Sequence, residues 1–133
     1  MGLIHFPFER VVEINTLILD TEPGMRGVIN IPLLQGALAR VDNAIAYEGL
    51  EDVFEIAAKY VACIAVAHSL PDANKRTGLA VGLEYLSLND YELTLDNDFL
   101  ADAVRDLVTG ELEELDFADV LYSCYIASLE KML

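Results

Sequence analysis

The segment His68-Ser69-Leu70-Pro71-Asp72-Ala73-Asn74-Lys75-Arg76-Thr77 is a short polar stretch between two apolar stretches with helical periodicity. The first apolar stretch runs from Val53 to Ala67 and the second from Thr77 to Leu88. Because Pro71 blocks a continuous helix, the pattern predicts two helices joined by a turn at this segment. Charged and titratable groups between apolar helices are costly to bury unless they are paired or bind something. We therefore interpret the turn as the candidate active site.

Apolar periodicity along the rest of the chain predicts an all-α fold, a bundle of about six helices in a single domain over residues 1–133. Besides the two helices around the polar turn, four more are expected, at Phe8–Leu19, Pro32–Ile45, Phe99–Val108 and from Asp116 onward. A proline and two glycines predict a loop between residues 21 and 27.

Two short segments between the predicted helices have an extended pattern. Val28–Ile31 could form a short flap, and Tyr91–Leu95 alternates as a short strand or an extended link would. Arg26 and Asn30, which lie in and just after the glycine-containing loop, are interpreted either as flap residues over the site or as ordinary loop residues.

The chain is strongly acidic. Its 133 residues include 8 Lys+Arg and 23 Asp+Glu, so the formal net charge is −15. Such a surface repels a phosphate backbone, and direct nucleic-acid binding is therefore not expected. The same field favours a basic protein partner over an acidic one.

The sequence gives no signal for secretion or for a membrane partner. No apolar run reaches the ~18 residues of a membrane span, and the first residues lack a basic segment followed by a long apolar one. Cys63 and Cys124 each lie in an apolar helical pattern and are expected to be buried free thiols. We expect a cytoplasmic protein.

The predicted start of the second central helix, near Asn74, has the features of a phosphate site. The first N–H groups of a helix have no partner within the helix, and with the positive end of the helix dipole they attract anions. Lys75 and Arg76 lie in this first turn, where each cation costs ~0.3–1 kcal/mol in the field of the dipole. Two such cations together indicate that they face an anion.

His68 and Asp72 add two titratable groups to the turn. His68 is interpreted either as an imidazolium favoured by the preceding helix end or as a neutral base that removes a proton from a hydroxyl. Asp72 can hold Mg²⁺, which takes one or two carboxylates plus phosphate oxygens, or can orient His68. Asn74 can bind phosphate or fix the turn. A simpler alternative makes His68 and Asp72 helix caps and leaves Lys75 and Arg76 solvated, but one amide and two cations in the same turn favour the phosphate site.

The pattern His68-x-x-x-Asp72-Ala73-Asn74-Lys75-Arg76-Thr77 resembles the signature of the Doc (death-on-curing) branch of the Fic family. Leu70 replaces the usual phenylalanine and Pro71 a polar residue, and we expect Leu70 to remain an apolar anchor under the turn. The similarity covers about Pro23 to Leu88, and its other parts are Pro23-Gly24-Met25, Ala39-Arg40-Val41, Ala46-Tyr47-Glu48, Asp52-Val53-Phe54-Glu55 and Tyr60.

This resemblance implies a small helical enzyme that transfers part of a nucleoside triphosphate to a protein hydroxyl. The Doc branch is a protein kinase, which passes the γ-phosphate of ATP to a threonine of elongation factor Tu and so stops translation. Carried over, the roles are a general base at His68, a magnesium ligand at Asp72, and phosphate binders at Asn74, Lys75 and Arg76, with Lys75 also in the catalytic set. The implied cofactors are ATP and Mg²⁺. The implied partner is an antitoxin whose C-terminal helix covers the site of this toxin.

Two alternatives to the kinase remain open. Most Fic enzymes transfer AMP and have glycine where this chain has Lys75, whose side chain would crowd the α-phosphate position. A degenerate Fic-fold module that binds a nucleotide or a partner without turnover is the second alternative.

Overall fold

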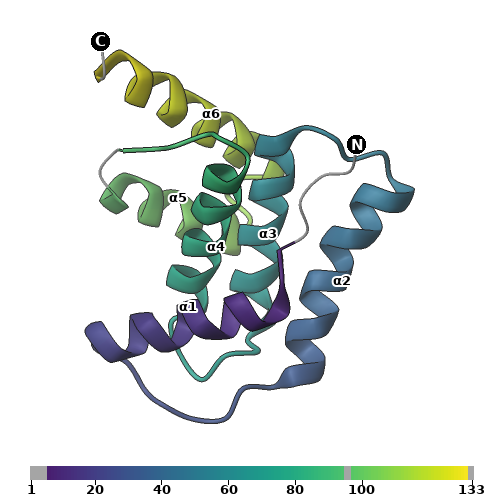
Figure 1. Cartoon of the computed structure of the whole chain (residues 1–133), viewed down its shortest axis with the longest axis vertical. Helices are drawn as coiled ribbons and strands as arrows, with labels where there is room; N and C mark the ends of the chain where they lie inside the picture. Colours follow the sequence, from purple (N-terminus) through teal and green to yellow (C-terminus); the bar gives the residue numbers. More distant parts are fainter. Residues whose placement is uncertain (1–5, 95–96, 132–133) are drawn as a thin grey trace.

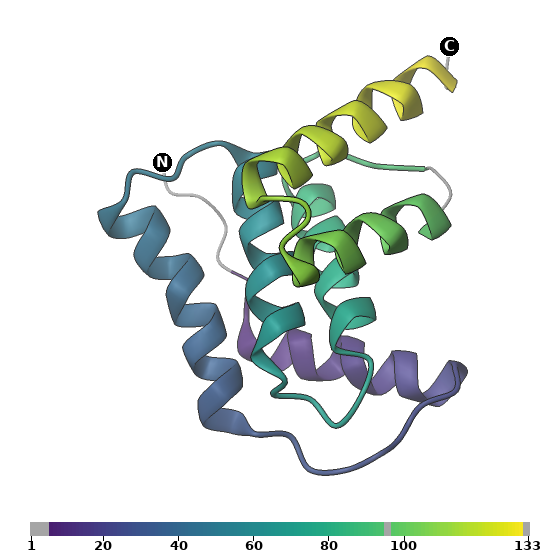
Figure 2. The same cartoon turned by 180° about the vertical axis from the view of Figure 1, so that it is seen from behind.

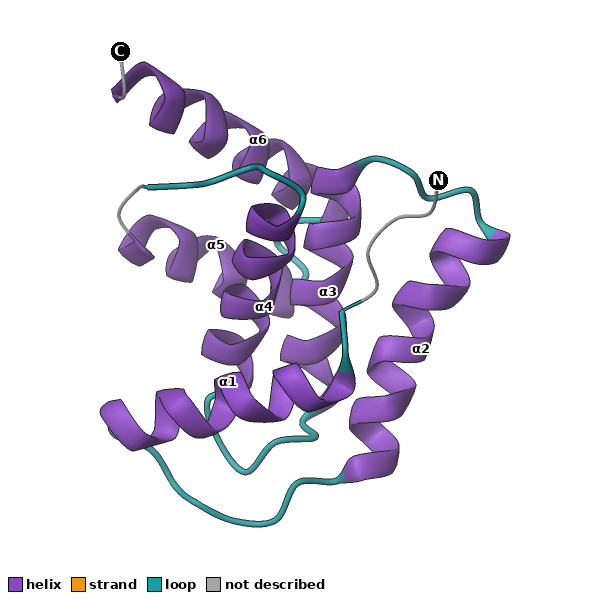
Figure 3. Ribbon diagram, viewed as in Figure 1, coloured by secondary structure: helices purple, strands orange, loops and turns teal. Residues whose placement is uncertain are grey.

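The computed structural model describes residues 6–94 and 97–131, which form six α-helices (Figure 1). The helices are α1 (Phe8–Thr21), α2 (Ile31–Tyr47), α3 (Val53–Ala67), α4 (Asn74–Leu88), α5 (Asn97–Thr109) and α6 (Glu114–Lys131). None of the described residues forms a β-strand (Figure 3). Among these six helices, none combines the length and apolar character that crossing a membrane requires. The predicted all-α fold of about six helices is confirmed.

Neither segment with an extended pattern forms a strand in the described part of the chain, which does not include Leu95: residues 28–30 and 91–94 are loops, and Ile31 is the first residue of α2. A strand needs a neighbouring strand for its backbone hydrogen bonds, but these backbone groups bond elsewhere. The N–H of Asn30 donates to the carbonyl oxygen of Ser69 at 2.7 Å. The N–H of Thr94 donates to Ser128 Oγ at 2.9 Å. Residues 91–94 are therefore a link, and residues 28–30 lead directly into α2.

The central helix is α3, which contacts α2, α4, α5 and α6 (Figures 1 and 2). Ten of its 15 residues are buried, so it is apolar on almost every side, as its sequence predicts. Asp52 caps its N-terminus, because the carboxylate accepts hydrogen bonds from the N–H groups of Phe54 and Glu55 at 2.9 and 3.0 Å. The helix therefore has a fixed start and a buried body, and the polar turn begins where it ends.

Two glycines let α4 approach α3 closely. A Cβ on Gly78 would lie 2.9 Å from the carbonyl oxygen of Val61 and 3.4 Å from the N atom of Ala65. A Cβ on Gly82 would lie 2.4 Å from Val61 Cγ2 and 3.3 Å from the carbonyl oxygen of Ala57. We call this contact, made by Gly78 and Gly82 of α4 with residues 57–65 of α3, the glycine seam. It fixes the first turns of α4 against the C-terminal half of α3.

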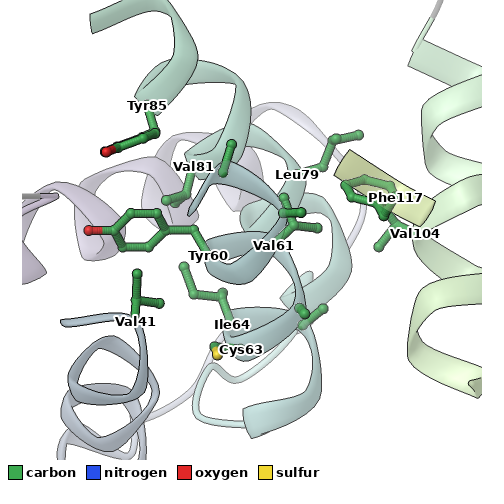
Figure 4. Close-up of a cluster of buried hydrophobic side chains, with 14 of the residues drawn as sticks. Val41, Tyr60, Val61, Cys63, Ile64, Leu79, Val81, Tyr85, Val104 and Phe117 are labelled. Carbon is green, nitrogen blue, oxygen red and sulfur yellow. The ribbon is translucent and has the colours of Figure 1, made fainter. Parts of the chain in front are cut away.

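Aromatic and thiol groups complete the core between these helices. Figure 4 shows Tyr60 of α3 between Val41 of α2 and Tyr85 of α4, and the two tyrosine rings lie 5.1 Å apart. Cys63 and Cys124 are free and buried, as predicted, and burial raises the pKa of both thiols. Neither thiol is set up as a nucleophile by this arrangement.

Candidate active site

The polar turn is bounded by two residues in the left-handed backbone region. His68 follows α3 with φ 51° and ψ 34°, and Ala73 precedes α4 with φ 61° and ψ 32°. Residues other than glycine adopt this conformation at a cost of roughly 1–3 kcal/mol each, and it persists only where the surroundings enforce it. The turn is therefore held in a fixed shape by its neighbours.

Asn74 holds the turn together from inside. Its Oδ1 accepts a hydrogen bond from the N–H of Leu70 at 3.2 Å, and its Nδ2 donates to the carbonyl oxygen of Leu70 at 3.2 Å. Leu70 is only 5% exposed and belongs to the core, so the expected apolar anchor is present. Of the two roles considered for the Asn74 side chain, the structure shows that it fixes the turn. One amide hydrogen and the backbone N–H remain for a phosphate.

A buried asparagine of α1 supports the turn from outside. Asn15 is 2% exposed, and its Nδ2 donates to the carbonyl oxygen of Asp72 at 3.0 Å and to Thr77 Oγ1 at 3.1 Å. The local sequence pattern alone does not identify Asn15 as a site residue. Its signal is a polar side chain on the buried face of an amphipathic helix, four residues after Val11 and four before Leu19, both of which are buried.

The Asp72 carboxylate is held by backbone donors. Its Oδ2 accepts from the N–H of Met25 at 2.9 Å and its Oδ1 from the N–H of Ala73 at 2.7 Å. These two hydrogen bonds, assisted by the charge of Arg76, lower the pKa of Asp72. The loop can approach this closely because Gly24 has no Cβ. A Cβ there would lie 2.6 Å from Leu19 Cδ2 and 3.2 Å from Asp72 Oδ2. Asp72 is therefore an ionised acceptor at neutral pH.

The two cations of the first turn of α4 differ in their contacts. Arg76 Nη2 donates to the carbonyl oxygen of Pro23 at 3.1 Å, and its Nη1 lies 3.5 Å from Glu22 Oε2. Lys75 is exposed and makes no ion pair or hydrogen bond with the described residues. No side chain caps α4. The first turn of α4 thus presents N–H groups and an unpaired ammonium to an anion.

Arg26 and Asn30 have structural contacts of their own. Arg26 forms an ion pair with Asp20 and lies 3.4 Å from the carbonyl oxygen of Leu19. Asn30 caps α2, since its Oδ1 accepts from the N–H of Leu33 at 3.1 Å. Of the two interpretations of these residues, the structure supports ordinary loop and cap residues.

One pocket brings all the predicted site residues together. Its volume is about 320 Å³, and it is lined by His68, Asp72, Asn74, Lys75 and Arg76. Apolar groups from α3 and α4, including Ala65 and Leu79, form part of its wall. His68 is exposed, so its imidazole is accessible to a hydroxyl that enters the pocket.

A further wall of the pocket comes from α5, a helix that was not predicted to belong to the site. Ala101, Val104 and Arg105 line it, and their spacing of three and four places them on one face of the helix. A signal was present in the sequence, because Arg105 is the only cation between Arg76 and Lys131.

A metal ion at this site would need ligands beyond the described residues. The described residues contain no group of three or more His, Cys, Asp or Glu that could hold a metal ion alone. Asp72 is ionised, and each of its oxygens keeps a free lone pair. One such carboxylate together with phosphate oxygens and water fits the coordination of Mg²⁺.

The sequence is similar to a known family over much more than this turn. Residues 5–86 match the model of the Fic/DOC family. The chain belongs to this family. It is also 31% identical over 121 residues to Protein kinase doc of Escherichia phage P1, an alignment that covers 91% of this chain and 95% of the phage protein. The predicted Doc-type membership of the Fic/DOC family is confirmed. The family match ends in α4, so α5 lies beyond it.

Proposed function

We propose that this chain is a Doc-like toxin that acts as a protein serine/threonine kinase. It transfers the γ-phosphate of ATP to a threonine of a protein target, for which elongation factor Tu is our first candidate, and thereby inhibits translation. The observation that carries the proposal is the single pocket in which His68, Asp72, Lys75 and Arg76 meet the uncapped N-terminus of α4. The similarity to Protein kinase doc supports the kinase over the other family chemistries.

The proposed reaction uses positioning and charge more than covalent chemistry. The imidazole of His68 accepts the proton of the threonine hydroxyl while its oxygen attacks the γ-phosphorus. The bond from that phosphorus to the bridging oxygen breaks, and ADP leaves. Lys75, Arg76 and the N–H groups of α4 neutralise the charge on the phosphates. Asp72 would hold Mg²⁺, which supplies charge neutralisation between the phosphates when it is bound.

Arg76 is available for this role because its ion pair is weak. In its ion pair with Glu22, the Arg76 side chain is 38% exposed and the Glu22 side chain is 47% exposed. Ion pairs with this much exposure contribute roughly 0–1 kcal/mol. A phosphate can therefore replace Glu22 as the partner of Arg76 at little cost.

We also propose a partner and a compartment. The partner is an antitoxin whose C-terminal segment folds as a helix over the site, with basic residues that contact the acidic surface around the pocket. The compartment is the cytoplasm, where ATP and the translation machinery are present. Neither nucleic acid nor a membrane is a direct partner in this proposal.

The test is incubation of the purified chain with elongation factor Tu, Mg²⁺ and ATP, followed by intact-mass measurement of the factor. We expect a gain of one phosphate. The His68→Ala variant should lose transfer while its circular dichroism spectrum stays native. Full activity in that variant would reject His68 as the base.

Other outcomes of this assay and of related measurements would identify the alternatives. A gain of AMP would mark an AMP transferase and refute the kinase. No modification of any protein in a translation extract, together with measurable ATP binding, would mark a binding module. Lys75→Gly tests the kinase assignment further, because an unchanged product in this variant would show that Lys75 does not set the orientation of the nucleotide.

A further inference from the structure

Cations are concentrated at one pocket of an otherwise acidic chain. The chain has 8 Lys+Arg and 23 Asp+Glu, yet the charged residues that line the pocket are Lys75, Arg76, Arg105 and one acid, Asp72. Three of the eight cations and one of the 23 acids therefore lie here. Lys75 and Arg76 belong to the family signature, whereas Arg105 comes from α5, beyond the family match.

Arg105 contributes little to the stability of the fold. Its side chain is 62% exposed and forms an ion pair with Asp102 of the same helix, whose side chain is 66% exposed. Exposed pairs at this spacing stabilise a helix by roughly 0.2–0.5 kcal/mol. Arg105 also follows Ala101 and Val104 on the face of α5 that lines the pocket. The guanidinium is therefore available to a ligand, and the fold loses little when it exchanges Asp102 for another anion.

The chemistry of the pocket indicates which anion this is. A guanidinium offers paired N–H donors that match phosphate oxygens in a bidentate contact. The N–H groups of α4 with Lys75 and Arg76 would neutralise a polyphosphate from the α4 side of the pocket only. A cation on the α5 side would complete the neutralisation from a second direction.

We propose that Arg105 binds the polyphosphate of the nucleotide from the α5 wall of the pocket and so acts as a further positioning residue for phosphate transfer. The inference rests on the proposed use of a nucleoside triphosphate at this site. It assigns a role to α5, which otherwise supplies only apolar wall at the pocket.

The test compares the wild-type chain with Arg105→Gln, Arg105→Lys, Asp102→Asn and Lys131→Gln by isothermal titration calorimetry with Mg²⁺. The probes are ATP and inorganic tripolyphosphate, which lacks the nucleoside. Lys131→Gln is the charge-matched control, because it removes one cation from the exposed end of α6. Circular dichroism and thermal melting establish that each variant is folded.

Arg105→Gln should weaken the binding of ATP and of tripolyphosphate by the same factor, roughly tenfold, which is the size of a charge-assisted hydrogen bond. Arg105→Lys should fall between wild type and Arg105→Gln, because it keeps the charge and loses the paired donors. Asp102→Asn should bind both probes at least as well as wild type, since it frees the guanidinium. Lys131→Gln should match wild type.

Several outcomes would overturn the inference. Unchanged ATP affinity in Arg105→Gln would do so, as would weaker ATP binding with unchanged tripolyphosphate binding. Equal losses in Arg105→Gln and Asp102→Asn would show that only the ion pair matters. If the wild-type chain transfers phosphate while Arg105→Gln binds normally, this inference fails and the proposed function stands. If the wild-type chain binds no nucleotide, both fail.

Discussion

Two regions that differ in kind contact the polar turn, the glycine seam and the loop formed by residues 22–25. The seam is buried, and α3 and α4 lie so close there that only glycine fits at positions 78 and 82. The loop is mostly exposed and contacts the turn through single polar contacts to Asp72 and Arg76. The seam therefore sets the position of α4 and of the candidate site residues that it carries. The loop contacts Asp72 and Arg76, which the proposed nucleotide would bind in its place.

Breaking the seam should have the largest effect on stability. In Gly78→Ala the new Cβ would meet a backbone carbonyl oxygen 2.9 Å away, which cannot move without shifting α3. We expect the free energy of unfolding to fall by about 1–3 kcal/mol, as measured by urea denaturation. Transfer activity should fall as well, because α4 carries the cations.

Gly36→Ala is the matched control for this substitution. Gly36 is exposed in the middle of α2, and a Cβ there would have nothing within 4 Å. Alanine should stabilise the helix by roughly 0.5–1 kcal/mol. Equal losses in the two variants would mean that close approach is not what makes Gly78 necessary.

Removing the α1 support should have the next largest effect. Asn15→Leu leaves the carbonyl oxygen of Asp72 and Thr77 Oγ1 without this donor in a buried setting. The expected loss is about 1–3 kcal/mol in the free energy of unfolding, with a lower transfer rate in the folded protein. Thr16→Ala, an exposed change on the same helix, should stay within about 0.5 kcal/mol of wild type. A transfer rate in Asn15→Leu equal to that of the Thr16→Ala control would argue against support of the turn by α1.

The ion pair between α1 and α4 should have a smaller effect that depends on pH. Arg10 contacts Glu84 through Nε and Nη2 at 2.7 and 2.6 Å, and these hydrogen bonds lower the pKa of Glu84. We expect Glu84→Gln to cost about 1 kcal/mol at neutral pH.

The sign of the pH effect follows from the direction of that shift. The stability from a lowered carboxyl pKa is present above the ordinary value of 4.5 and is lost as the pH falls through the lowered value. Urea unfolding of wild type and Glu84→Gln from pH 7 to pH 3 should show a difference that shrinks in acid. A constant difference over this range would contradict the role of the Glu84 charge.

The smallest effect on stability should come from the loop. Glu22→Gln removes a pair at 3.5 Å in which both partners are exposed, so the free energy of unfolding should change by less than about 0.5 kcal/mol. Because Arg76 loses a competing anion, calorimetry should show ATP affinity equal to or a few times above wild type. Weaker ATP binding in this variant would mean that the loop supports the nucleotide instead of competing with it.

The central hairpin could be predicted from the sequence because its signals are local. Apolar periodicity predicts α3 and α4, Pro71 separates them, and the candidate site residues lie within ten consecutive residues. These residues line one pocket because a single turn carries them. The family resemblance could also be recognised, since its signature occupies the same turn.

The supports from elsewhere in the chain could not be predicted in the same way. Asn15 and Arg105 reach the site through the packing of α1 and α5, and neither position has a local pattern that specifies its neighbour. Gly78 and Gly82 are unfavourable residues for a helix interior when only local propensity is considered. The need for glycine at these two positions is visible only when α3 is seen packed against them.

The separation in sequence between the turn and its α1 support has a consequence for the order of folding. The glycine seam joins residues 57–65 with residues 78 and 82, so closing it requires only a short connecting segment and little loop entropy. The hydrogen bonds of Asn15 to Asp72 and Thr77 span 57 and 62 residues, and such distant contacts form more slowly. The α3–α4 hairpin should therefore assemble first, with its turn still unsupported. The proposed catalytic site would then be complete only after the late docking of α1.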